Sequence, residues 1–78
     1  MFKTYKFYSV FYRLPAIAQK AFYDAAMRSG DYFAAWNMAD HADHKRLDVD
    51  AMMFAAEEAA QNSGALPVRV YAAMRLIK

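Results

Sequence analysis

The segment from Asp40 to Asp50, DHADHKRLDVD, contains the residue types that could bind a metal or transfer protons. His41 and His44 are three positions apart and Asp40 lies four before His44, so on a helix these side chains would share one face. Zinc sites in proteins usually need a further nitrogen or sulfur ligand. We therefore interpret the segment as a solvated helix end and predict no metal or cofactor. A weak site of two histidines and one aspartate is the alternative.

Other catalytic patterns are missing from the sequence. The chain has no cysteine and only two glycines, which leaves no catalytic thiol, no disulfide and no glycine-rich phosphate loop. No serine or threonine stands where a nucleophile would be expected. These observations predict a protein that is not an enzyme, and the lack of cysteine favours a reducing, cytoplasmic setting.

The first aromatic segment, residues 2–14, suggests a strand. It has six aromatic and three basic residues and no acid, and aromatic side chains suit a pleated, half-buried surface. The alternative is an N-terminal helix, because Lys3, Lys6, Ser9 and Arg13 fall on one side of a helical wheel.

A helix is predicted over residues 15–29. Pro15 suits a first helical position and Gly30 a C-terminal cap. On the exposed face, charged residues repeat every four positions and can pair along the helix; they are Lys20, Asp24 and Arg28.

Two more helices are predicted in the middle of the chain. Asp31 can cap a helix that runs to about Arg46, and Asp48 or Asp50 can cap another that ends before Gly64. In the last of these helices Phe54 falls among polar residues, including Glu57. An exposed phenylalanine with a polar rim is typical of a contact point, so we interpret Phe54 and Glu57 as partner-binding residues. The alternative is that Trp36 or a neighbouring subunit covers Phe54.

The C-terminal sequence alternates apolar and polar residues over 67–77, which predicts a second strand paired with the first. The resulting fold is α+β, one domain over residues 1–78 in the order β-α-α-α-β, with two terminal strands against three helices. A two-stranded sheet has open edges, so a homodimer is compatible with it.

An internal echo supports an all-α alternative. Ser29 and Gly30 recur 34 positions later as Ser63 and Gly64, and Gly30-Asp31-Tyr32 resembles the turn and second helix of a tetratricopeptide repeat. That resemblance implies helical hairpins throughout, but it covers under a third of the chain. We transfer no binding residues from it.

If both terminal segments are strands, one face of the sheet combines cations with flat rings. Such a face suits a protein partner, in which tyrosine and arginine anchor the contact, or single-stranded nucleic acid, whose bases stack on rings. The residues predicted on this face are Lys6, Tyr8, Tyr12, Arg69, Tyr71 and Arg75.

The charge pattern limits the function further. All eight acids lie between Asp24 and Glu58, whereas residues 1–13 and 65–78 carry only basic charges. No uncharged run exceeds the ten residues of 59–68, far below the roughly 20 needed to span a membrane. We predict a non-enzymatic protein that binds a larger cytoplasmic protein stoichiometrically, as small phage or mobile-element inhibitors do. A nucleic-acid-binding protein is the alternative.

Overall fold

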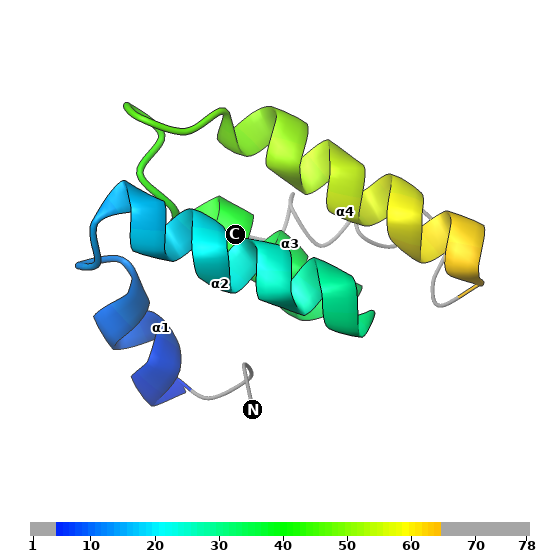
Figure 1. The fold of residues 1–78 in the computed structure, drawn as a ribbon, viewed down its shortest axis with the longest axis horizontal. Coiled ribbons are helices and arrows are strands. Elements are labelled where there is room, and N and C mark those ends of the chain that lie inside the picture. The colour runs from blue at the N-terminus through cyan, green and yellow to red at the C-terminus, as the bar shows by residue number, and fades with distance from the viewer. Residues whose placement is uncertain (1–4, 65–78) are drawn as a thin grey trace.

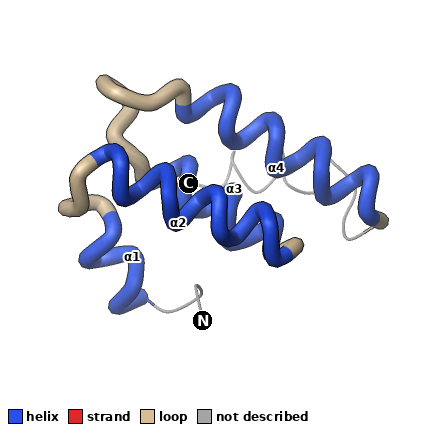
Figure 2. The backbone as a smooth tube through the Cα atoms, viewed as in Figure 1, coloured by secondary structure: helices blue, strands red, loops and turns tan. Residues whose placement is uncertain are grey.

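Four helices make up the part of the chain that the computed structural model describes, residues 5–64 (Figures 1 and 2). They are α1 (Tyr5–Phe11), α2 (Ala16–Ser29), α3 (Tyr32–His41) and α4 (Val49–Ser63). Helix α3 packs against each of the other three. No strand occurs within this range, so the α+β fold and its paired terminal strands are wrong, and the all-α class is correct for these residues. The strand predicted over 67–77 lies outside the described residues.

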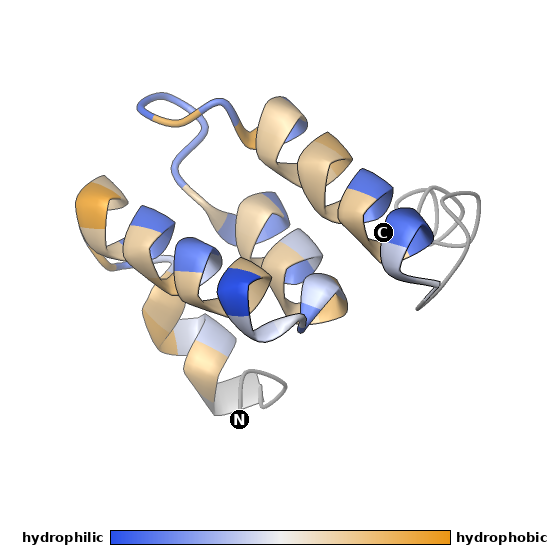
Figure 3. Cartoon of the chain, turned by 45° about the vertical axis from the view of Figure 1, so that its right-hand side comes forward, coloured by the Kyte–Doolittle hydropathy of each residue, from blue (hydrophilic) through white to orange (hydrophobic). Residues whose placement is uncertain are grey.

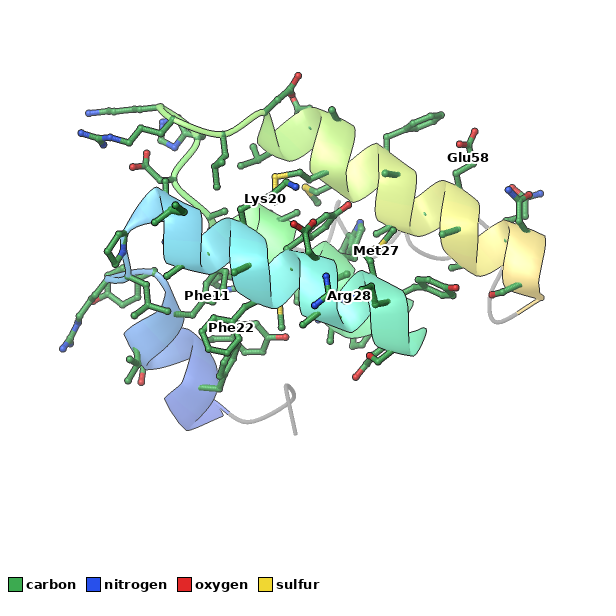
Figure 4. All side chains as sticks on the ribbon, in the orientation of Figure 1. Phe11, Lys20, Phe22, Met27, Arg28 and Glu58 are labelled. Carbon is green, nitrogen blue, oxygen red and sulfur yellow. The ribbon has the colours of Figure 1, made fainter. Side chains whose placement is uncertain are left out.

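The aromatic N-terminal segment forms helix α1 and not the predicted strand. Phe7 and Phe11 are one helical turn apart, with ring centroids separated by 5.6 Å. The centroid of the Phe7 ring lies 5.5 Å from that of Phe22 of α2. The centroid of the Phe11 ring lies 6.4 Å from that of Phe22 (Figure 4). The strand prediction relied on propensity alone, and the packing of aromatic rings at helical spacing outweighs that propensity.

Helices α2 and α4 end in the same way, as the sequence predicts. Gly30 and Gly64 follow the last turns with φ values of +81° and +77°. Residues other than glycine rarely adopt this left-handed conformation. In both helices a serine precedes the glycine, and its hydroxyl donates to the carbonyl three residues earlier at 3.0 Å.

Helix α3 begins where it was predicted to begin, but it ends at His41, five residues before the predicted end at Arg46. The carboxylate of Asp31 accepts from the Ala34 N–H at 3.3 Å and caps the helix. After His41 the backbone becomes extended at Ala42. The Asp43 carboxylate then accepts from the Lys45 N–H at 3.0 Å and starts a separate turn. Asp48, one of the two predicted caps, accepts from the Ala51 N–H and begins α4.

The core lies along α3. Two buried hydrogen bonds connect α3 and α2 to α4. The indole N–H of Trp36 donates to the Glu57 carboxylate at 2.9 Å, and the Tyr23 hydroxyl donates to the Met52 carbonyl at 2.8 Å. Alanine occupies many of the other core positions, which allows the helices to approach closely.

Hydrophilic residues form repeated bands along α2 and α4 (Figure 3), including the ion pair between Lys20 and Asp24 at 2.9 Å. None of the described helices is long and apolar enough to cross a membrane.

Candidate functional site

Two adjoining hollows open at the end of the molecule where α1 meets the start of α2. The first, of about 320 Å³, is lined by Tyr8, Ser9, Tyr12, Arg13 and His41, and we call it the aromatic hollow. Its lining includes one guanidinium and no carboxylate. Rings and hydroxyls beside a single cation can hold an anionic or aromatic group.

Tyr8 and His41 form one wall of the aromatic hollow. Their rings stack with centroids 5.2 Å apart and planes inclined by 30°. The Nδ1 atom of His41 lies 2.8 Å from the Asn37 carbonyl, so this nitrogen carries the hydrogen. Burial of the Tyr8 hydroxyl, with a smaller effect from the Asp31 charge, raises the pKa of Tyr8 to about 12. Tyr8 therefore remains neutral at physiological pH.

Tyr12 and Arg13 form the ridge between the two hollows, since both residues line each of them. The Arg13 guanidinium lies 5.5 Å from the centre of the Tyr12 ring, and its Nε donates to the Tyr12 hydroxyl at 3.4 Å. Tyr12 is 56% exposed. The ridge therefore presents an aromatic ring and a cation together to solvent.

The second hollow, of about 600 Å³, joins the first turn of α2 to the loop after α3, and we call it the loop hollow. Ile17 is 82% exposed on this side. Across from it, Arg46 and Asp43 form an ion pair at 2.8 Å. The hydrogen bond from Arg46, followed by that from the Lys45 N–H, lowers the pKa of Asp43. The full lining is Tyr12, Arg13, Leu14, Pro15, Ala16, Ile17, Asp43 and Arg46.

Gln19 fixes the parts of the chain that surround these hollows. Its side chain is completely buried. The amide nitrogen donates to the Phe11 carbonyl at 3.1 Å, and the amide oxygen accepts from the Asp43 N–H at 2.8 Å. One side chain of α2 thus holds both the end of α1 and the loop after α3. Gln19 was not predicted as a site residue; its place on one helical face with Tyr23 and Ala26, which are also buried, was the available signal.

The structure brings together only some of the predicted partner-binding residues. Tyr8 and Tyr12 line the same hollow, and Phe54 is exposed on α4 as expected. Glu57 is 3% exposed and bonded to Trp36, so its predicted place on the exposed face is wrong. The remaining predictions fall outside the described part of the chain; they are the side chain of Lys6 and residues Arg69, Tyr71 and Arg75.

The predicted sheet platform is also wrong, because residues 5–11 are helical. Ile17, Arg46 and the role of His41 in the hollow were not predicted from the sequence. The spacing of Tyr8 and Tyr12, one helical turn apart, was the available signal for a shared site once α1 is taken as a helix.

The arrangement proposed for a metal also fails. Helix α3 ends at His41, so His44 lies in the following turn and does not share a helical face with Asp40. Among residues 5–64 no group of three metal-ligating side chains is close enough to hold an ion. Comparison with protein-family models, curated proteins and solved structures found no match to this chain, so the tetratricopeptide resemblance gains no support.

Proposed function

We propose that this chain is a non-enzymatic binding protein that acts stoichiometrically on a larger protein. The supporting observation is the exposed ridge of Tyr12 and Arg13 between two hollows, with the bare side chain of Ile17 beside it. Tyrosine and arginine are the residues that most often dominate protein interfaces. The lack of cysteine is consistent with a partner in the cytoplasm.

Phe54 supplies a second, separate contact in this proposal. Its ring is 59% exposed on α4, surrounded by the exposed polar residues Asp50, Glu58 and Gln61. Helices α1 and α4 lie on opposite sides of the α2–α3 pair (Figures 1 and 3). A partner that touches both sites must therefore be large enough to reach around the bundle.

Site-specific photo-cross-linking tests the proposal. A photoreactive phenylalanine analogue replaces Ile17, and the tagged protein is irradiated in its native cells. The same analogue at Arg28, an exposed position at the far end of α2 that belongs to neither proposed contact, is the matched control for nonspecific capture. We expect one protein to be linked at position 17 in a one-to-one product that the control does not give.

Two results would contradict the proposal. A cross-linked product that nuclease removes would identify a nucleic acid as the ligand. Identical products from positions 17 and 28 would show that the end formed by the two hollows has no specific partner.

A further inference from the structure

We infer that the partner inserts an acidic segment at the ridge between the two hollows. In this segment a carboxylate binds Arg13, and a neighbouring apolar side chain covers Ile17. This inference rests on the proposed function and specifies the chemistry of the partner. It follows from the charges around the two hollows and from the apolar surface beside them.

The cations of the two hollows differ in what they already bind. Arg46 pairs with the Asp43 carboxylate at 2.8 Å. Within residues 5–64 the Arg13 side chain contacts only Tyr12, through a hydrogen bond to its hydroxyl and a contact with its ring. No carboxylate lines the aromatic hollow, and the single one in the loop hollow belongs to the Arg46 pair. The ridge thus offers a positive charge that lacks a counterion among the lining residues.

A carboxylate matches this charge better than other groups do. A guanidinium presents parallel N–H donors that fit the two oxygens of a carboxylate. The contact with the Tyr12 ring restrains the Arg13 side chain, which reduces the entropy lost when a ligand binds. The Ile17 side chain lines the neighbouring hollow. An apolar group next to the carboxylate of the partner would therefore cover the Ile17 side chain and remove it from water.

An acidic peptide fits the surface better than a nucleic acid. Neutralising a phosphate backbone takes several cations along a track. Here Arg46 is paired with Asp43, and the exposed acids Asp48 and Asp50 follow it closely at the start of α4. Among the residues that line the two hollows, the surface therefore provides one guanidinium without a carboxylate partner, beside an apolar side chain, which suits a single acidic side chain.

A library of random displayed peptides provides the probe for this inference. It is selected against the wild-type protein and against Arg13→Glu. Arg28→Glu, on the exposed side at the far end of α2 (Figure 4), makes the same change in net charge and is the matched control. Circular dichroism confirms that each variant is folded.

We expect peptides selected by the wild type to combine Asp or Glu with a large apolar residue. Their dissociation constants should rise at least about tenfold with Arg13→Glu, the loss expected for a hydrogen bond to a charged group. Arg28→Glu should leave the constants within about twofold. Selection against Arg13→Glu should enrich Lys or Arg instead of Asp or Glu.

The inference is overturned by binders that lack acids, by equal binding to Arg13→Glu, or by a library that yields no binder. These failures are distinguishable from failure of the proposed function. If position 17 still cross-links a protein while binding ignores the charge at position 13, the partner is a protein that uses other chemistry. If the cross-link itself is absent or is a nucleic acid, both proposals fall.

Discussion

Glu57 shows how one residue on a helix can be assigned to the wrong face. Its neighbours Glu58 and Gln61 are exposed, and a helical wheel groups the three together. The indole N–H of Trp36, however, is buried and needs an acceptor. The sequence shows that Trp36 requires a partner, but several acids and amides could satisfy it. Only the packing of α3 against α4 selects Glu57.

The substitution Glu57→Ala tests this buried hydrogen bond. It leaves the Trp36 N–H without its acceptor, and we expect the free energy of unfolding to fall by about 2 kcal/mol. The neighbouring substitution Glu58→Ala, at an exposed position, should change it by less than about 0.5 kcal/mol. Urea denaturation followed by circular dichroism measures both. Equal effects of the two substitutions would show that the Trp36 bond does not contribute to stability.

Tyr8 should make the protein sensitive to alkaline pH. The pKa of its hydroxyl is raised from 10.0 to about 12 in the folded protein, mainly by burial. Between these values the unfolded chain releases the proton and the folded protein keeps it, so stability is complete below pH 10 and declines as the pH rises towards 12. Tyr8→Phe removes this contribution.

Denaturation of the wild type and of Tyr8→Phe at pH 8 and pH 11 measures the effect. We expect the wild type to lose more stability between the two conditions than the variant does. The comparison at pH 8, where the hydroxyl is protonated in both states, corrects for the lost contact with the Ala34 carbonyl. An equal loss in both proteins would show that Tyr8 titrates normally.

At the scale of the elements, local signals predicted the middle of the chain better than its beginning. Helix α2 and the ends at Gly30 and Gly64 depend on caps that the sequence displays directly. The aromatic residues of α1 favour a strand until Phe22 of α2 is brought against Phe7 and Phe11. The early end of α3 likewise depends on the contact of Asp43 with the buried Gln19, which no local pattern reveals.

Gln19→Met tests whether this residue holds α1 and the loop after α3 in place. The substitution nearly preserves the side-chain volume but removes both buried hydrogen bonds. It leaves the Asp43 N–H without its acceptor, and we expect a loss of about 2–3 kcal/mol. Amide hydrogen exchange should accelerate in α1 and in residues 42–47 before it does in α4.

Lys20→Met is the control for this experiment. Lys20 is adjacent to Gln19 but makes a half-exposed ion pair with Asp24, which contributes about 0.5 kcal/mol or less. Exchange that accelerates evenly over all four helices in Gln19→Met would indicate general destabilisation and not the release of α1.

Gly30→Ala tests the end of α2. The glycine has a φ of +81°, and a Cβ there would meet no atom within 4 Å. The cost is therefore backbone strain alone, and we expect a loss of about 1 kcal/mol. Thermal unfolding measures this loss, and Ser29→Ala, one position earlier, should change stability by less. A neutral Gly30→Ala would mean that the turn can relax to another conformation.

At the scale of the whole molecule, the 34-residue echo corresponds to a real similarity of packing. Helices α2 and α4 both contact α3, and Ala26 and Ala60 occupy equivalent, fully buried positions in them. The echo therefore indicated the helical class within residues 5–64, while the composition of residues 2–14 pointed away from it. The candidate site was less accessible to prediction, because it combines side chains from α1, α2, the end of α3 and the loop after it. Sequence alone did not bring these segments together.

The separation of the two proposed contacts gives a prediction about the complete binding surface. Ile17→Ser and Phe54→Ser alter side chains that are 82% and 59% exposed, so each should change the free energy of unfolding by less than about 0.5 kcal/mol. Each should weaken binding of the cross-linked partner by about 1–2 kcal/mol. Because Ile17 lies in the first turn of α2 and lines the loop hollow, whereas Phe54 lies on α4 and lines neither hollow, the losses in the double variant should add to within about 0.5 kcal/mol.

Isothermal titration of the four proteins with the purified partner measures these energies. An additive double variant means that the partner engages both sites independently, as a large protein enclosing the bundle would. If Phe54→Ser has no effect, the partner contacts only the end formed by the two hollows, and Phe54 is not part of the binding surface. Losses that fail to add would show that the two sites are energetically coupled.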